Sequence, residues 1–550
     1  MITFLRAFGL VTLALAGCAH VTNSSLCGQH GSGLESSPCN YDPSPDTSYR
    51  FAPRRDRDTL VIVTFSGGGT RAAALAFGTL EALADLKGTQ EGSSLLDEVS
   101  LISSVSGGSV TAGWYALNGA AGLQQPDEPG TMLHFLNGDW TAKLVWKGLN
   151  PVSLMRYAFT PYTRSDVLAD FFASHLYDHS TYADVLKHYK ADATQPYIIL
   201  NATDIGHETV FPFTQGRFDF LCSDLLHYRL ADAVAASANF PLAFSPLGLK
   251  NFSGCPAQSS PTWTGEGPPQ WVEHYHTFDQ EEAPTSHSYA LSQLRAARLA
   301  NDYLKPTAVQ PPDQYVHLLD GGVGDNLGVR STLALEDDPA RVPGLYLRLG
   351  APRPEGYQNI KRVLYIVVNA RARDPGSIDQ QKRPPGEIRT ALRMVDTQLD
   401  NSTLADQDFL ISELEATAHR AAHSAMAAPL QGQTQECLPV SQTAPAQEPS
   451  DAPFLSRAPS AQARCKAPSS PLQFYVASVD FEMIPNKDCR DRYWHLKTNW
   501  GLKRDQVEGL RKIARVILSR SPDLADFYRD LHQPAPERLD FNEVCTLVGH

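Results

Sequence analysis

The chain has 550 residues, of which 42% are hydrophobic and 19% charged, so it can form one large domain or two or three smaller ones. Its formal net charge at pH 7 is -13. Nucleic-acid binding depends on Lys and Arg side chains that neutralise phosphates, so this acidic balance argues against a nucleic-acid partner.

The N-terminus resembles an export signal that ends in a lipid-attachment site. Arg6 precedes an apolar run of eleven residues, 7–17, which is too short to cross a bilayer as a helix. The run ends in Leu-Ala-Gly before Cys18, which resembles a bacterial lipobox, in which the cysteine receives a diacylglycerol after cleavage. We therefore expect residues 1–17 to be removed and Cys18 to carry the membrane anchor. Acyl chains on this residue would hold the protein firmly, because each buried CH₂ contributes about 0.8 kcal/mol. A simple export signal beside an unrelated cysteine is the alternative.

The residue after Cys18 and the other cysteines extend this prediction. Ala19 stands where an Asp would retain the protein in the inner membrane, which favours the outer membrane of a bacterial envelope, facing the periplasm or the exterior. Eight cysteines remain besides Cys18, and an even number in an exported protein indicates disulfides. Eight cysteines allow 105 pairings, of which we expect the pairing of sequence neighbours, 27–39, 222–255, 437–465 and 489–545. The sequence contains no CxxC motif, and no close Cys/His cluster has metal-ligand spacing. No metal or other cofactor is therefore expected.

Strands and helices are predicted to alternate after a polar tether at residues 18–57. Helices are predicted at residues 71–86 and from Ser109 onward. Continuous apolar runs rich in β-branched residues predict buried strands at 59–65, 99–104, 197–203, 363–369 and 474–481. This alternation predicts an α/β fold with a mainly parallel sheet.

The C-terminal part is expected to be mostly helical. Residues 386–428 predict one or two amphipathic helices, and residues 504–532 are helical again. Between them, residues 429–471 are rich in Pro, Gln, Ala and Ser and predict an irregular surface insertion. We expect a main domain at 58–380, with residues 381–550 completing or covering it.

A glycine-rich turn follows the first predicted strand, with the sequence FSGGGTR at residues 65–71. Glycines allow unusual dihedral angles, so Gly67, Gly68 and Gly69 could aim N–H groups at an anion beside a helix N-terminus. That anion could be a phosphate or the oxyanion of an acyl-transfer intermediate, although the phosphate-loop pattern GxxxxGK[ST] is absent. A purely structural turn is the alternative.

A second strand-to-helix turn has the sequence SVSGGS at residues 104–109. A nucleophile elbow needs small residues on both sides of its serine, because the turn is sharp. Among the serines here, only Ser106 has small neighbours at both flanking positions, although Ser104 replaces the first glycine of the usual GxSxG pattern. The alternative is a turn in which Ser106 only caps the following helix.

A third motif, LLDGG at residues 318–322, contains Asp320 in an Asp-Gly pair that by itself could be an ordinary turn. In chain order, the glycine loop, the GxSxG-like elbow and the Asp-Gly-Gly motif together resemble the patatin-like phospholipase family. Its motifs are GGGxR, GxSxG and DG[AG]. The segment AASANFP at residues 235–241 resembles the small-residue and proline segment between the serine and the aspartate of that family. The resemblance covers about residues 58–330.

This resemblance implies a three-layer α/β/α fold and a Ser-Asp dyad without histidine. Carried over, Ser106 is the nucleophile, Asp320 its catalytic partner, and the backbone N–H groups of Gly67, Gly68 and Gly69 form the oxyanion hole. Arg71 stands where the family has its loop arginine, and would orient the loop or meet a phosphate.

Residue types alone leave a catalytic triad open, because histidines follow Asp320 in the order Ser…Asp…His of many hydrolases. The candidates are His419, His423 and His495, with His317 three residues before Asp320.

The predicted function is therefore a membrane-anchored serine acyl hydrolase that cleaves lipid acyl esters through an acyl-enzyme. The alternatives are a non-catalytic envelope lipoprotein that keeps the fold as a binding module, and an acyltransferase or thioesterase with the same dyad. Residues 144–159 are apolar, aromatic and mildly basic, and would lie either at a membrane interface beside the active site or in the core.

Overall fold

The computed structural model describes residues 20–26, 47–54, 57–252, 303, 314–335, 356–373, 386–427 and 472–548. The predicted signal peptide, Cys18, most of the tether and the insertion at 429–471 lie outside these residues, and the side chains of His419 and His423 are also outside the description.

The centre of the molecule is an eight-stranded mixed sheet. Its main path has the order β5-β6-β3-β2-β1-β7-β8, with β4 paired to β3. The strands are β1 (Thr59–Phe65), β2 (Val99–Val105), β3 (Tyr197–Asp204), β4 (Thr209–Pro212), β5 (Leu247–Lys250), β6 (Tyr315–Asp320), β7 (Arg362–Asn369) and β8 (Gln473–Asp480). All five strands predicted from apolar runs are present within one residue at each end, and they form the parallel block β3-β2-β1-β7-β8.

Three short strands were not predicted, and all of them pair antiparallel. β6 pairs with β3, and β5 pairs with β6. The pairing of β6 brings the residue at its end, Asp320, beside Ala202 of β3, one strand away from the end of β2.

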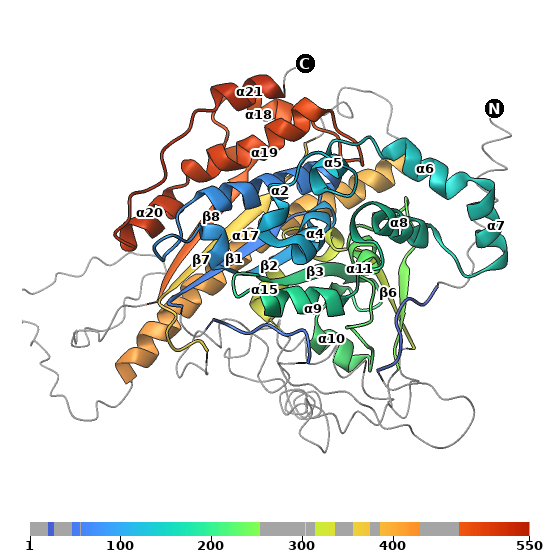
Figure 1. The fold of residues 1–550 in the computed structure, drawn as a ribbon, viewed down its shortest axis with the longest axis horizontal. Helices are drawn as coiled ribbons and strands as arrows, with labels where there is room; N and C mark the ends of the chain where they lie inside the picture. The colour runs from blue at the N-terminus through green and yellow to red at the C-terminus, as the bar shows by residue number, and fades with distance from the viewer. Residues whose placement is uncertain are drawn as a thin grey trace, which may run out of the picture.

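Helices cover both faces of the sheet, as an α/β fold requires (Figure 1). α2 and α4 lie in front of the sheet in that view, and α17 crosses behind it. The helices up to residue 191 are α2 (Gly69–Asp85), α3 (Leu95–Glu98), α4 (Gly107–Gly122), α5 (Met132–Leu136), α6 (Thr141–Leu149), α7 (Pro151–Phe159), α8 (Arg164–Phe172), the π-helix η1 (Ala173–Tyr177) and α9 (Tyr182–Ala191). The later ones are α10 (Gln215–Phe220), α11 (Leu230–Ser237), α14 (Gly322–Asp325), α15 (Val329–Ala334), α17 (Glu387–Ala427), the 3₁₀ turn η3 (Phe481–Met483), α18 (Lys487–Trp494), α19 (Arg504–Ser519), α20 (Pro522–Asp530) and α21 (Asn542–Leu547).

The C-terminal region belongs to the same core as the rest of the chain. β8 is an edge strand of the sheet, and α19 packs closely on α2, where a Cβ at Gly78 would lie 2.3 Å from the Cα of Arg511. Within the predicted helical stretch 386–428, the described residues form one helix, α17, whereas the predicted helical stretch 504–532 is broken before Pro522, which begins α20. Proline is favoured at the first position of a helix, because it has no N–H to leave unpaired.

A disulfide joins Cys489 of α18 to Cys545 of α21, with a Cα–Cα distance of 5.1 Å, as predicted. Cys222 is also disulfide-bonded, but Cys255, its predicted partner, lies outside the described residues, as do the cysteines of the other two predicted pairs. Among the described helices, none is both long and apolar enough to cross a membrane.

Candidate active site

Ser106 stands on a sharp turn between β2 and α4. Its backbone angles are φ 50° and ψ -120°, a region that a residue with a side chain enters only when its surroundings enforce it. The next two residues must be glycine, because a Cβ at Gly107 would lie 2.1 Å from the carbonyl oxygen of Gly69 and one at Gly108 would lie 2.6 Å from the Cβ of Phe65. The backbone N–H of Ser106 donates to the hydroxyl of Ser237 at 2.9 Å. These contacts fix the serine side chain at the carboxyl end of the sheet.

Asp320 meets Ser106 although 214 positions separate them in the chain. The hydroxyl of Ser106 donates to Oδ2 of Asp320 at 2.8 Å, and the backbone N–H of Gly322 donates to Oδ1 at 2.9 Å. Ser106 is 7% exposed and Asp320 is 6% exposed. Each carboxylate oxygen therefore has a defined partner in a site with little access for bulk water.

Burial changes the acid strength of Asp320. It raises the pKa of this carboxyl to about 6, against the opposing effect of the hydrogen bonds from Gly322 and Ser106, which favour the ionised form. A carboxylate with such a pKa is ionised at neutral pH and accepts a proton more readily than an ordinary aspartate.

The glycine loop lies directly beside Ser106, and its three N–H groups are not equivalent. The N–H of Gly67 donates to the carbonyl of Asn326 at 3.2 Å, so it is occupied within the protein. Gly68 and Gly69 have φ angles of 139° and 59°, and their N–H groups have no acceptor among the residues that the structure describes. The resemblance implied that the N–H groups of all three glycines form the oxyanion hole. The structure leaves two, because Asn326 uses the first to hold the loop in place.

Arg71 is buried and ties three segments together. Its guanidinium donates to the carbonyls of Ala370 and Leu496, each at 2.7 Å, and to the hydroxyl of Thr498 at 2.8 Å. Burial lowers its pKa to about 10, with an opposing contribution from Asp396. Of the two roles predicted for Arg71, these contacts match the orientation of the loop.

Ser237 and its neighbours hold the backbone around Ser106 and Asp320 in place. The hydroxyl of Ser237 donates to the carbonyl of Asn201 at 2.6 Å, and its carbonyl accepts the N–H of Gly321 at 3.0 Å. The carbonyl of Asn239 accepts the N–H of Asp320 at 3.1 Å. The sequence pointed to residues 235–241 only by resemblance. Their position shows that they join the serine turn to the aspartate strand.

Comparison with known families agrees with this geometry. Residues 63–333 match the model of a family described as patatin-like phospholipase. These residues form a patatin-like phospholipase domain. The predicted resemblance and the predicted α/β fold are thereby confirmed. Strands β7 and β8, which complete the sheet of the patatin-like domain, lie beyond the matched residues.

The solved structures that match part of the chain include two of human GIVD cytosolic phospholipase A2. The first is 13% identical with a TM-score of 0.25, and the match covers 56% of this chain and 46% of that chain. The second, in complex with methyl gamma-linolenyl fluorophosphonate inhibitor and terbium chloride, is 14% identical with a TM-score of 0.27, and covers 61% and 43%. The chain thus spans less than half the length of these structures. No curated protein sequence matches it.

Two of the four candidate triad histidines lie near Ser106 and Asp320. His317 and His495 line the same cavity as Ser106 and Asp320. Within the described part of the chain, no histidine ring is hydrogen-bonded to either residue, and no group of three or more His, Cys, Asp or Glu could hold a metal ion.

The cavity that Ser106 and Asp320 line has a volume of about 1750 Å³. Its floor includes Ser106, Asp320 and the glycine loop, and much of its wall is apolar. Side chains from α6, α7 and α8 contribute to that wall: Leu144, Val145, Leu149, Leu154, Tyr157 and Val167. A pocket of this size and lining suits a long apolar ligand group that presents one polar end to Ser106.

Proposed function

We propose that this protein is a membrane-anchored serine acyl hydrolase that cleaves lipid acyl esters with Ser106 and Asp320. The observation that carries the proposal is the 2.8 Å hydrogen bond between the serine hydroxyl and Oδ2 of an aspartate whose pKa burial raises to about 6. The patatin-like phospholipase family implies lipid acyl hydrolysis in general.

In the first half of the proposed reaction, the Oγ of Ser106 attacks the ester carbonyl carbon while Asp320 Oδ2 takes the hydroxyl proton. The carbonyl oxygen becomes an oxyanion, which the N–H groups of Gly68 and Gly69 can receive, helped by the N-terminus of α2. One such donor is worth roughly 3–4 kcal/mol of transition-state stabilisation. The proton on Asp320 passes to the leaving alkoxide, the C–O bond breaks, and the fatty acyl group stays on Ser106.

In the second half, water replaces the alcohol. It gives a proton to Asp320 and attacks the acyl carbon, and the proton returns to Ser106 Oγ as the C–O bond of the acyl-enzyme breaks. The products are a free fatty acid and the regenerated serine. The apolar cavity wall would hold the acyl chain throughout both halves.

The test is hydrolysis of a phospholipid ester by purified wild-type protein, Ser106→Ala and Asp320→Asn, together with labelling by a fluorophosphonate. We expect wild type to label and hydrolyse, Ser106→Ala to do neither, and Asp320→Asn to lose most of both. Ser100→Ala is the matched control, because Ser100 is likewise buried, lies in the preceding strand β2, and its hydroxyl donates only to the carbonyl of Glu98. A wild type that neither labels nor releases fatty acid from any acyl ester would overturn the proposal.

The anchor is tested separately. Cells that express Cys18→Ser should release the protein from the membrane fraction and give no diacylglycerol-modified N-terminal peptide by mass spectrometry. Wild-type protein should be found in the outer-membrane fraction and should give the diacylglycerol-modified N-terminal peptide. An unmodified mature N-terminus in wild type would exclude anchoring and leave the hydrolase proposal standing.

A further inference from the structure

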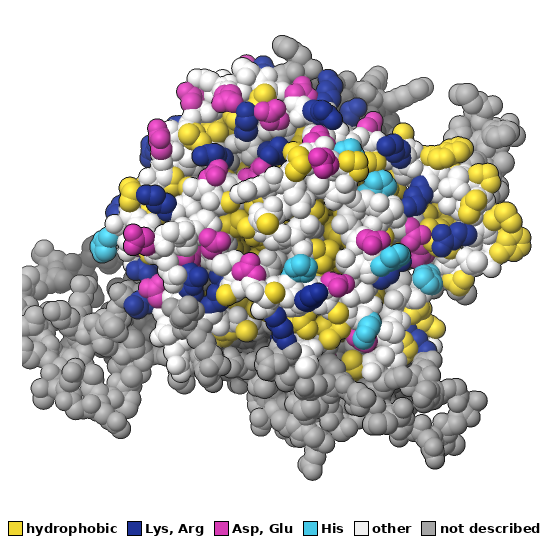
Figure 2. All heavy atoms as spheres, viewed as in Figure 1, with side chains coloured by type: hydrophobic (Ala, Val, Ile, Leu, Met, Phe, Trp, Pro, Cys, Tyr) yellow, Lys and Arg dark blue, Asp and Glu magenta, His cyan; other side chains and the backbone are white. Residues whose placement is uncertain are grey.

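Helices α6 and α7 present apolar side chains to solvent instead of packing them. Of the fourteen exposed large hydrophobic residues in the described part of the chain, seven lie between positions 145 and 159. Phe159 is 80% exposed, Trp146 70% and Val152 68%, whereas the only buried residues of the two helices are Leu144 and Ser153. Figure 2 shows hydrophobic side chains gathered at this end of the molecule. Apolar patches of this kind mark surfaces that meet a partner.

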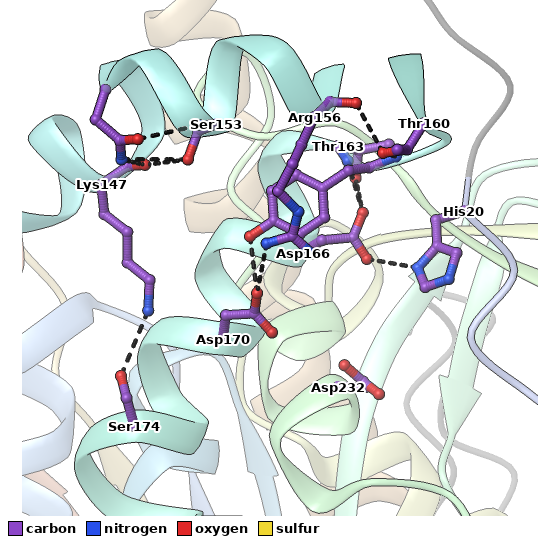
Figure 3. A network of polar contacts seen from close by, with 12 residues as sticks. His20, Lys147, Ser153, Arg156, Thr160, Thr163, Asp166, Asp170, Ser174 and Asp232 are labelled. Atoms are coloured by element: carbon purple, nitrogen blue, oxygen red, sulfur yellow. Dashed lines mark hydrogen bonds and ion pairs between the residues drawn. The ribbon is translucent and has the colours of Figure 1, made fainter. Parts of the chain in front are cut away.

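The charged side chains that α6 and α7 themselves contribute are of one sign. The two helices contain Lys143, Lys147 and Arg156 and no Asp or Glu. Lys147 Nζ lies 3.4 Å from the hydroxyl of Ser174, and Arg156 stacks on the ring of Tyr162 at 3.4 Å and lies 3.5 Å from Asp170 (Figure 3). Neither lysine forms an ion pair with a carboxylate of the described residues. Exposed apolar side chains interspersed with cations on the same two helices suit a membrane whose surface carries anionic lipid.

The exposed surface is continuous with the cavity above Ser106. Val145, Leu149 and Leu154 are each more than 40% exposed and also line that cavity. An acyl chain that leaves a bilayer beneath α6 and α7 could therefore reach the dyad along apolar side chains, without crossing water. This continuity favours a lipid surface over a protein partner, which would close the entrance instead of feeding it.

The start of the described chain lies on the same side of the molecule. His20 Nδ1 is 2.8 Å from Oδ1 of Asp166, whose Oδ2 accepts the N–H and the hydroxyl of Thr163 at the start of α8 (Figure 3). Thr163 follows Phe159, the last residue of α7, by only four positions in the chain. Two residues of extended chain span no more than about 7 Å, so a lipid on Cys18 would be tethered within that reach of His20.

We propose that α6 and α7 form the surface that docks onto an anionic bilayer and admits lipid to the cavity. This inference rests on the proposed function for its consequence, because it names where the acyl ester comes from. The docking itself is a binding event and can be measured without catalysis.

The first experiment measures depth. Full-length Ser106→Ala protein is reconstituted into vesicles of equal parts phosphatidylcholine and phosphatidylglycerol with brominated acyl chains, which quench tryptophan fluorescence on contact. We expect quenching that disappears largely in Trp146→Phe and persists in Trp114→Phe, because Trp114 is only 1% exposed in the core. Equal quenching in all three proteins would overturn the proposal.

The second experiment compares two exposed methionines. Met155 of α7 is 62% exposed, and Met483 after β8 is 52% exposed and lies outside the cavity. We expect Met155→Glu to lower the ratio of vesicle hydrolysis to hydrolysis of a dissolved short-chain ester by roughly tenfold, since burying such a side chain is worth about 1.5 kcal/mol or more. Met483→Glu should leave that ratio unchanged. An equal effect of the two variants would overturn the docking surface.

The outcomes separate the two proposals. If wild type hydrolyses no ester but Trp146 is quenched, the docking surface stands and the hydrolase proposal fails. If wild type hydrolyses esters while Trp146 is not quenched, docking fails alone. If Met155→Glu instead converts a dimer in detergent into a monomer, the surface is an interface between two copies, and the lipid proposal is overturned.

Discussion

Gly107 in the first turn of α4 packs directly against the backbone of Gly69 in the first turn of α2. A Cβ at Gly107 would lie 2.1 Å from the carbonyl oxygen of Gly69 and 2.8 Å from its nitrogen. The serine turn and the glycine loop are therefore positioned by each other. A change at one moves the other.

Gly107→Ala should accordingly reduce hydrolysis by about a hundredfold or more, the typical effect of losing one oxyanion donor, and cost about 1–3 kcal/mol of stability through overpacking. Rates and denaturant unfolding of the purified variant measure both effects. Gly386→Ala is the control, because a Cβ there would meet nothing within 4 Å. If Gly107→Ala has wild-type activity, the glycine loop is not the oxyanion site.

The activity should depend on pH through Asp320. The base must be ionised to take the serine proton, and burial raises its pKa to about 6, so kcat/KM should rise as pH increases through about 6 and then level off. An imidazole titrates in the same range, so His317→Gln and His495→Gln are the necessary comparisons. Both should keep the inflection. Loss of the inflection in either variant would indicate that this histidine is the catalytic base of a Ser-His-Asp triad.

Arg71→Lys should destabilise the protein despite keeping the charge. Lysine cannot reproduce the fork that bonds the carbonyls of Ala370 and Leu496, which would be left buried and unpaired. We expect a loss of roughly 2–3 kcal/mol in the free energy of unfolding. Arg515→Lys, at a residue that is 57% exposed and paired with Asp85, should change it little. If Arg71 contacts a substrate phosphate instead, Arg71→Lys would raise KM for phospholipid and leave stability intact.

Stability should also depend on pH through Asp325, which faces Asp406 in the core beneath α17. Burial and the neighbouring Asp406 raise the pKa of Asp325 to about 8. The folded state therefore holds a proton that the unfolded chain releases near its ordinary pKa of about 3.9, so the free energy of unfolding falls as pH rises towards about 8.

Above about pH 6, the titration of Asp320 no longer changes the free energy of unfolding. In that range Asp325→Asn should flatten the decline, because an amide keeps a hydrogen atom for Asp406 at every pH. Thermal unfolding at several pH values measures the slope. Asp178→Asn, at a carboxylate whose side chain is 90% exposed, should keep the wild-type slope. Identical slopes for Asp325→Asn and wild type would show that the two carboxyls do not share a proton.

The sequence predicted those parts of the molecule that depend on local pattern. The runs that became β1, β2, β3 and β7 are apolar because both faces of those strands are buried, whereas β8 at the sheet edge buries mainly alternate residues. β6 escaped prediction because its burial alternates along a short run, from an exposed Tyr315 to a buried Asp320.

The candidate site was predicted only where a motif carried it. Ser106 and Asp320 stand in recognisable turns, but nothing in the sequence shows that Asn326 occupies the N–H of Gly67 or that Ser237 holds Ser106. Those contacts join positions far apart in the chain, and only the folded sheet brings them together. For residues 144–159 the sequence left open whether they face a membrane or pack in the core, since an apolar run has the same pattern in both cases.

The place of β1 in the sheet has a consequence for how the chain is made. β1 lies between β2 and β7, and Thr59 at its start is opposite Arg362. The parallel block therefore cannot close until some three hundred further residues have left the ribosome, and β8 adds another hundred. Until then, the edge of β1 that faces away from β2 has no strand partner, and such unpaired edges invite aggregation.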